Sequence, residues 1–348
     1  MSSPTTEAPF LPIHTVRLTL RALTAADAPT FAAYRNDPQV ARYQDWTLPV
    51  TAADAEAFVA SQAGVTGPVA GDWVQIGVEY EGELAGDVAV GLDGSAALAM
   101  IGYTLRADRQ HRGIGREAVT ALVDALFDRL GVHRIAATLD PANTASARLL
   151  EDLGFRYEGC AKAAAAVRGA WLDDDRYAML RPDRQAWRER PRGRPDEVRL
   201  LEITPDDAPA VARLATHRSQ QRFVATMAQS FRDALFPETV GGAPVVPWLR
   251  AVAAEGELAG FVMVAEATPA HPDPFLWRLL VDRRHQGRGI GTAVVNELAD
   301  RLRGDGHRVL KVSWVGGDGG PEPFYLRLGF VPTGEVADGE TVAELPLR

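Results

Sequence analysis

The chain has 348 residues, of which 46% are hydrophobic and 24% are charged, and its formal net charge at pH 7 is -9. This length suits two domains with buried cores, and the acidic balance disfavours nucleic acid as a partner and suits a cationic small molecule better. The single cysteine, Cys160, excludes an internal disulfide and a cysteine metal cluster, and leaves little case for a cysteine nucleophile, so we expect no metal site.

No apolar run approaches the roughly 18 residues that a membrane span needs. The first residues, "MSSPTTEAPFLPIH", also lack the basic and apolar regions of a secretion signal. We therefore expect a cytoplasmic protein without a membrane partner.

The first half is predicted to alternate strands and helices. A strand at 16–23 leads into a helix whose start, Thr-x-x-Asp at 24–27, resembles a capping box. In chain order there follow a hairpin with "EGELAG" at its turn (73–92), a strand (100–108), a glycine loop (109–118), an amphipathic helix with apolar residues from Val119 to Leu130, a strand (133–139) and a short helix that ends at Leu-Gly-Phe (153–155).

An arginine- and proline-rich stretch without apolar periodicity, 183–196, is predicted to be a linker. The order of the first half then repeats as a strand (198–204), a Thr-x-x-Asp helix (204–215), a hairpin with the same "EGELAG" (248–266), a strand (275–282), a glycine loop (283–292), an amphipathic helix (294–302), a strand (308–315) and a helix that ends at Leu-Gly-Phe (328–330).

The two halves are predicted to be an internal duplication. Gly113 aligns with Gly289 at an offset of 176 residues, and Gly154 aligns with Gly329 at an offset of 175. Two motifs that keep their separation to within one residue favour two complete α/β units. The boundaries predicted are 1–182 and 197–348, joined by the linker.

Each glycine loop has the sequence Gln-x-x-Gly-x-Gly between a strand and a helix. Successive backbone N–H groups at the positive end of a helix form a site for phosphate. A tight turn without a ligand is the alternative, but two copies with flanking arginines favour the anion site. Two other phosphate-binding motifs fit these loops less well. A Walker loop would need Gly-Lys-Ser/Thr, which is absent, and a dinucleotide-binding site would need G-x-G-x-x-G near the start of a βαβ unit.

The loops "RQHRGIGREA" and "HQGRGIGTAV", each followed by Leu-Gly-Phe, resemble the acyl-CoA signature of the GNAT N-acyltransferase superfamily. The first half resembles the RimJ/RimL-like alanine acetyltransferases in "HRIAATLDPANTASARLLEDLGFRYEG", and the second half resembles bacterial spermine/spermidine acetyltransferases in "FLWRLLVDRRHQGRGIG". The resemblance implies an α/β fold of two tandem GNAT-type domains, each a mixed, mostly antiparallel sheet flanked by helices.

The resemblance also implies that acetyl-CoA is the cofactor, with its pyrophosphate on the loop amides and its pantetheine beside the preceding strand, which splays from the next one. The coenzyme A residues implied in the first half are Leu105, Gln110, His111, Arg112, Gly113, Ile114, Gly115, Arg116 and Asn143. Those implied in the second half are Leu280, Val281, Gln286, Gly287, Arg288, Gly289, Ile290, Gly291 and Thr292. Asp318 stands where the first half has Asn143, which departs from the family pattern.

In the second half, the resemblance makes Tyr325 the group that protonates the coenzyme A thiolate, with a core aromatic as the alternative. Glu266, Glu340 and Asp338 are candidates for the base, and each is alternatively a surface carboxylate. Arg278 matches the polyamine-acetyltransferase pattern and is expected to orient a carboxylate rather than to contact the substrate.

The first half has Leu150 in place of a tyrosine, and Leu150 cannot donate a proton. Ser146 is the candidate hydroxyl there, and capping of the helix is its alternative role. Only alanines surround Ala165, where some relatives carry an acidic base. Trp46 is either a wall of an acceptor pocket or a packing residue.

We interpret the chain as an acetyl-CoA-dependent N-acetyltransferase that acetylates a primary amine of a small molecule, such as a polyamine, amino sugar or antibiotic, mainly in its C-terminal half. Acetylation of a protein N-terminus by the first half and a non-catalytic acyl-CoA sensor are the alternatives. The duplication implies an internal pseudo-dimer, compatible with a monomer.

Overall fold

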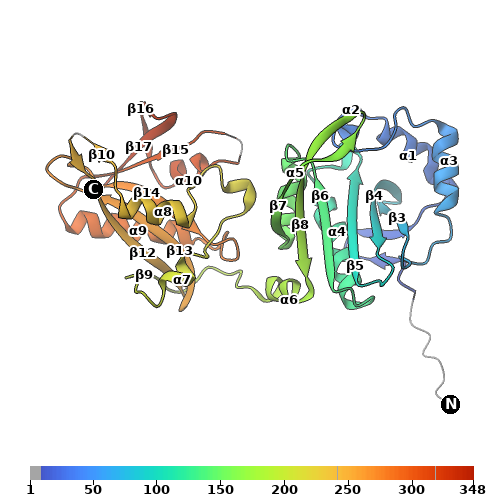
Figure 1. The fold of residues 1–348 in the computed structure, drawn as a ribbon, viewed down its shortest axis with the longest axis horizontal. Coiled ribbons are helices and arrows are strands. Elements are labelled where there is room, and N and C mark those ends of the chain that lie inside the picture. The colour runs from blue at the N-terminus through green and yellow to red at the C-terminus, as the bar shows by residue number, and fades with distance from the viewer. Residues whose placement is uncertain (1–8, 241, 318) are drawn as a thin grey trace, which may run out of the picture. The chain divides into compact units, whose positions relative to one another are not determined.

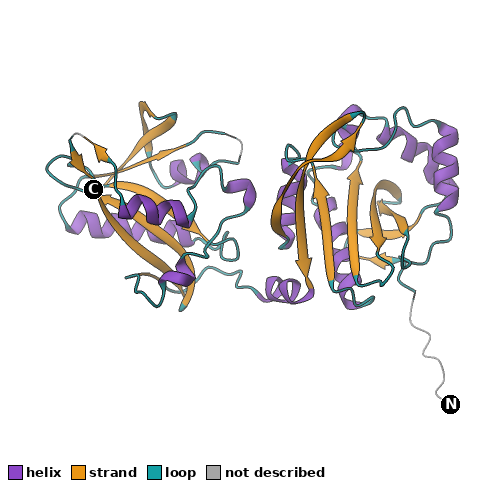
Figure 2. Cartoon of the chain, in the orientation of Figure 1, coloured by secondary structure: helices purple, strands orange, loops and turns teal. Residues whose placement is uncertain are grey.

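The computed structural model describes residues 9–240, 242–317 and 319–348. The chain divides into two compact units, Met1–Arg188 and Glu189–Arg348. Each unit is a sheet with helices packed on it (Figures 1 and 2). Both sheets are mixed and mostly antiparallel, so the predicted fold class is confirmed.

The first unit contains one eight-stranded sheet in the order β1-β2-β3-β4-β5-β6-β8-β7. Its strands are β1 (Ile13–His14), β2 (Leu18–Ala22), β3 (Trp73–Tyr80), β4 (Glu83–Leu92), β5 (Leu98–Leu105), β6 (Arg134–Leu139), β7 (Arg156–Val167) and β8 (Ala170–Leu180). Its helices are α1 (Ala28–Arg35), α2 (Pro38–Ala41), α3 (Ala52–Ser61), α4 (Ile114–Asp128), α5 (Thr144–Leu153) and α6 (Arg181–Glu189), with 3-10 turns η1 (Ala25–Asp27) and η2 (Ala107–Arg109).

The second unit contains a seven-stranded sheet in the order β16-β17-β15-β14-β13-β12-β9. Its strands are β9 (Val198–Leu201), β12 (Val246–Ala254), β13 (Glu257–Glu266), β14 (Phe275–Val281), β15 (Val309–Trp314), β16 (Val331–Ala337) and β17 (Glu340–Pro346), with a small ribbon of β10 (Thr239–Val240) and β11 (Ala243–Pro244). Its helices are α7 (Ala208–Val211), α8 (Met227–Leu235), α9 (Ile290–Gly304) and α10 (Glu322–Arg327), with the 3-10 turn η3 (Arg218–Gln220).

Each sheet opens at its single parallel pair of strands. β5 pairs with β6 only over Leu98–Met100, and from there to Leu105 it is paired with β4 alone. In the second unit β14 pairs with β15 only at Phe275 and Leu276 and continues to Val281. Strands that separate in this way leave backbone groups unpaired, and these groups need another partner.

The two units differ in the strand that borders this gap. β4 and β5 pair without a register shift from Gly86 to Leu92. β13 and β14 shift register between Met263 and Val264, which leaves Trp277 outside the ladder as a bulge. A bulge re-aims side chains and is frequent beside active sites.

The segment 183–196, expected to be a linker, begins as helix rather than irregular chain. α6 covers Arg181–Glu189, and Trp187 in it is 6% exposed. Its indole N–H donates to the carbonyl of Asp152, and Arg184 pairs with Asp124 at 2.6 Å. A Cβ on Gly154 would lie 2.4 Å from the Trp187 ring. These contacts place the helix in the first unit, because a buried tryptophan, its hydrogen bond and an ion pair outweigh the polar composition that suggested a linker.

We predict that Trp187→Ala lowers the free energy of unfolding of the first unit by about 3 kcal/mol, because a buried tryptophan is removed. The control is Trp171→Ala in the same unit, where the side chain is 70% exposed, and a change below about 0.5 kcal/mol is expected. Urea unfolding followed by circular dichroism measures both. Equal effects of the two substitutions would show that α6 does not pack as described.

Candidate functional site

The glycine loop of the first unit presents free backbone donors. Gly113 is the N-cap of α4 and has a φ of 76°, a conformation that glycine adopts without strain. The first intrahelical bond runs from the Glu117 N–H to the Gly113 carbonyl. The N–H groups of Ile114, Gly115 and Arg116 therefore have no intrahelical acceptor and can bind an anion.

The loop of the second unit has the same geometry. Gly289 is the N-cap of α9 with a φ of 79°, and the Ala293 N–H donates to its carbonyl. The Gln286 side chain donates to the Val281 carbonyl at 3.1 Å. In the first unit, Gln110 donates to the Leu105 carbonyl at the same 3.1 Å. The glutamine of the motif thus ties the loop to the end of the strand before it.

The second glycine of each loop lies where a side chain would not fit. A Cβ on Gly115 would lie 3.1 Å from Leu149 and 3.3 Å from Leu105. A Cβ on Gly291 would lie 3.1 Å from the Phe324 ring. In both units the first turn of the helix therefore approaches the neighbouring helix closely, and a bulkier residue would displace it.

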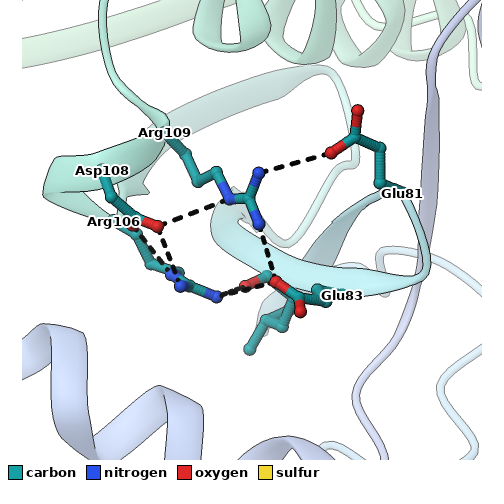
Figure 3. Close-up of polar contacts among 6 residues, drawn as sticks. Glu81, Glu83, Arg106, Asp108 and Arg109 are labelled. Atoms are coloured by element: carbon teal, nitrogen blue, oxygen red, sulfur yellow. Dashed lines mark hydrogen bonds and ion pairs between the residues drawn. The ribbon is translucent and has the colours of Figure 1, made fainter.

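Arg109 and Arg106 anchor the start of the first loop to the β3–β4 hairpin (Figure 3). Arg109 pairs with Glu83 at 2.7 Å and with Glu81 at 3.4 Å, and Arg106 pairs with Asp108 at 3.0 Å. Both glutamates belong to the repeated "EGELAG". The Arg109 guanidinium is therefore occupied by carboxylates and leaves anion binding to the backbone.

The same hexapeptide anchors the second loop through different residues. Arg288 pairs with Glu255 at 2.7 Å and also donates to the Gly193 carbonyl at 2.8 Å. His285 lies 3.9 Å from Glu257, and burial lowers the pKa of its imidazole. Arg288, predicted to bind coenzyme A, is 4% exposed, so only its backbone can face a ligand in the loop.

The other predicted coenzyme residues divide between loop and core. Arg116 pairs with Asp152 of α5, while His111 and Arg112 are exposed in the loop. Ile114 and Ile290 are 1% exposed and belong to the cores beneath α4 and α9.

Leu280 packs in the core that includes α7 and α8 residues, so its side chain faces away from α9. Gly287 has a φ of 75° in the loop, and Thr292 lies half-buried in the first turn of α9.

In the second unit the gap between β14 and β15 is part of a cavity of about 510 Å³. Residues of the strands, of α10 and of the segment before α8 line it, among them Phe223, Arg278, Trp314, Tyr325 and Glu340. β14 and β15 are not paired there, and the lining residues come from both faces of the sheet.

Tyr325 lies in the wall of this cavity within a group of aromatic rings. Its ring stacks on Trp314 at 5.4 Å between centroids and meets Phe330 edge-on at 5.3 Å. Burial raises the pKa of its phenol, and within the described residues no hydrogen bond to its hydroxyl is found. The phenol therefore stays protonated at neutral pH, with its proton free for a ligand.

The two glutamates proposed as bases lie in different places. Glu340 lines the cavity and accepts a hydrogen bond from the Ser313 hydroxyl. Glu266 pairs with Arg301 of α9 at 2.6 Å and is not among the cavity residues, so its carboxylate is held away from the site. Asp338 lies exposed in the β16–β17 turn, and Asp318 lies outside the described residues.

In the first unit the hydroxyl of Ser146 lies 2.6 Å from that of Tyr103, a contact between α5 and β5. Ser146 is not the helix cap, because Asn143 is the N-cap and accepts from the Ser146 N–H at 3.2 Å. Ser146 is the third residue of the helix, and its N–H is a donor that an N-cap side chain accepts from. Leu150 is fully buried in the core.

A buried carboxylate in the first unit escaped the sequence analysis. Asp87 on β4 is 1% exposed, accepts from Tyr34 and Gln75, and lies 3.6 Å from Arg35. Burial raises its pKa. The sequence signal was an aspartate inside the apolar run "LAGDVAV". Trp46 packs on Arg35 at 4.3 Å and donates to its carbonyl, which is a packing role.

None of the helices in the described part of the chain combines the length and apolar character that crossing a bilayer requires. Among the same residues, no group of three or more histidine, cysteine or acidic side chains is arranged to hold a metal ion.

Comparisons with known proteins match each unit separately. A model described as "Acetyltransferase (GNAT) domain" matches residues 17–156, and one described as "Acetyltransferase (GNAT) family" matches residues 209–330. An uncharacterized N-acetyltransferase p20 of Bacillus licheniformis is 29% identical over 49% of this chain and 96% of its own length.

Two further relatives carry more specific names. The [ribosomal protein uS5]-alanine N-acetyltransferase of Escherichia coli is 36% identical over 26% of this chain and 46% of its own length. A solved structure described as Mycobacterium smegmatis RimJ in complex with CoA-disulfide is 26% identical, covers 50% of this chain and 90% of its own, and has a TM-score of 0.44. With a matching model on each unit and N-acetyltransferases among its relatives, the chain belongs to the GNAT acetyltransferases and is an N-acyltransferase with two such domains in tandem.

Proposed function

We propose that the chain transfers the acetyl group of acetyl-CoA to a primary amine of a small molecule, and that the second unit carries most of this activity. The observation that carries the proposal is the cavity at the open strand pair, which brings the protonated Tyr325 and the carboxylate of Glu340 to one space. Bound there, acetyl-CoA supplies a thioester whose acyl group an amine can attack.

The residues present fit coenzyme A in both units. The free N–H groups after Gly113 and Gly289 suit a pyrophosphate, and the glycines at 115 and 291 leave no space that a side chain could occupy. The unpaired edges of β5 and β14 offer backbone groups to the amides of pantetheine. The predicted loop residues remain the proposed contacts, with Arg288 and Leu280 acting through their backbones only.

The proton steps fall to two side chains of the second unit. An alkylammonium with a pKa of about 10.4 must lose its proton before it can attack, which costs roughly 4 to 5 kcal/mol at pH 7. Water takes this first proton from the alkylammonium. Glu340 accepts the second as the new nitrogen–carbon bond forms, and Tyr325 donates its phenolic proton to the sulfur as the carbon–sulfur bond breaks. Return of the Glu340 proton to the Tyr325 phenolate through water restores both side chains.

Three differences favour the second unit over the first. The bulge at Trp277 interrupts the ladder beside the cavity, whereas β5 is paired regularly. Leu150 stands where the second unit has Tyr325. The Ser146 hydroxyl is engaged with Tyr103, and the residues on either side of Ala165 are alanines.

Acetylation of a protein N-terminus is the second candidate function, and the E. coli relative named for the uS5 alanine supports it. A first unit that binds acyl-CoA without catalysis is the third. Thiol release measured with small amines and with N-terminal peptides separates these candidates.

We predict two coenzyme A sites per chain, because both loops offer unblocked donors. Gly115→Val and Gly291→Val should each remove one site, since a side chain at either position collides with the facing helix. Titration calorimetry gives the stoichiometry. Gly304→Ala is the control, because nothing lies within 4 Å of its added Cβ. One site in the unaltered chain, lost with Gly291→Val, would make the first loop non-functional.

Tyr325→Phe should leave the affinity for acetyl-CoA unchanged and lower kcat by about 10²-fold or more, because the ring remains and only the proton donor is lost. Thiol release at saturating amine measures kcat. Ser146→Ala serves as the matched change in the first unit and should have little effect. Full activity in Tyr325→Phe together with loss in Ser146→Ala would transfer the catalytic role to the first unit.

A further inference from the structure

The acceptor side of the second-unit cavity carries an arginine with unused hydrogen-bond donors. Arg278 lines the cavity from β14, and its side chain is 23% exposed. One Nη donates to the Trp277 carbonyl at 2.7 Å, and the other pairs with Asp233 of α8 at 3.1 Å. Its Nε is buried and has no partner among the described residues. A guanidinium has five N–H donors, so three remain.

Arg278 lies on the face of the sheet opposite the coenzyme loop. Along β13, Phe261 and Met263 pack in the core that includes α7 and α8 residues, whereas Val262 and Val264 pack in the core that includes α9 and α10 residues. Successive side chains of a strand point to opposite faces, so the α8 face and the α9 face are separate. Through Asp233, Arg278 is bound to the α8 face. An amine acceptor must approach from this face, because α9 and α10 occupy the other.

Few charged side chains line the cavity. Among its described lining residues, Arg222, Arg278 and Glu340 are the charged ones. Asp233 is shared, because Arg232 also pairs with it at 2.6 Å. Glu340 is the proposed base, which leaves no other carboxylate among the described lining residues to bind a second ammonium group. A polyamine would place that second cation near Arg278, where desolvation strengthens the repulsion between like charges.

Building on the proposed function, we infer that the acceptor is a primary amine that also carries an anionic group, a carboxylate or a phosphate, and that Arg278 binds this group. The planar guanidinium suits both anions, because two of its parallel N–H donors can contact two acceptor oxygens. Three N–H donors of the guanidinium remain, one on the buried Nε and two on the Nη atoms, and the exposed part of the side chain lines the cavity. An anion that binds there gains donors that no described residue uses.

The test compares amines that share a carbon chain and differ at the far end. Butylamine, 4-aminobutyrate and putrescine carry a neutral, an anionic and a cationic end, and ethanolamine with O-phosphoethanolamine extends the comparison to phosphate. We expect kcat/KM for an anionic member to exceed that of its neutral analogue by about tenfold or more. Putrescine should rank below butylamine. The anion is identified by comparing 4-aminobutyrate and O-phosphoethanolamine: the one whose kcat/KM exceeds that of its neutral analogue by the larger factor carries the preferred group.

Arg278→Met should reduce the ratio of anionic to neutral kcat/KM to near one, and Arg278→Lys should retain part of it, because lysine keeps the charge without the fork. Arg232→Met is the matched control, since Arg232 contacts the same Asp233, is 65% exposed and does not line the cavity. It should leave the ratio unchanged. Circular dichroism melts show whether each variant is folded.

Two outcomes overturn the inference alone: faster turnover of putrescine than of 4-aminobutyrate and phosphoethanolamine, or a preference for anions that survives in Arg278→Met. Thiol release that no amine accelerates, with acetyl-CoA still bound, instead contradicts the proposed function itself.

Discussion

The whole architecture depends on one local constraint, a helix that begins at a glycine in the left-handed conformation with its first N–H groups unpaired. Such a helix start is stable only if it is held firmly against the sheet, since an unsatisfied donor costs free energy when it is buried. The glutamates of both "EGELAG" hairpins provide this support, through Arg109 in one unit and Arg288 in the other. The repeated hexapeptide is therefore conserved between the halves as a support for the loop.

From this shared scaffold the units diverge at the gap in the sheet. In the first unit Tyr103 and Ser146 join β5 to α5 by a hydrogen bond, and the strand ladder is regular. In the second unit a bulge and a cavity occupy the corresponding region, and Tyr325 closes the wall with an aromatic stack. The loop sets where an anion binds, and the side chains across the gap set what chemistry can follow.

The duplication, the fold class and the strands and helices around each glycine loop could be predicted from the sequence, because they depend on periodicity and on glycine spacing. The strands after Leu-Gly-Phe, β7, β8, β16 and β17, were not predicted. Contacts between distant segments could not. Glu266 was a plausible base until its partner Arg301 was located on α9, and α6 was hidden by a polar composition that Trp187 and its neighbours outweigh. Asn143 rather than Ser146 caps α5, a distinction of one helical turn that sequence patterns do not resolve.

Net charge is a global property that does not determine the charge inside a cavity. The chain carries -9, which favours cationic ligands at long range. Mobile ions screen such a field beyond about 8 Å at physiological ionic strength, so the groups that line a cavity dominate inside it. In the second unit those groups include two arginines and one glutamate. Asp233 pairs with both Arg232 and Arg278, so local ion pairs, rather than the net charge of the chain, set the charge that a ligand meets there.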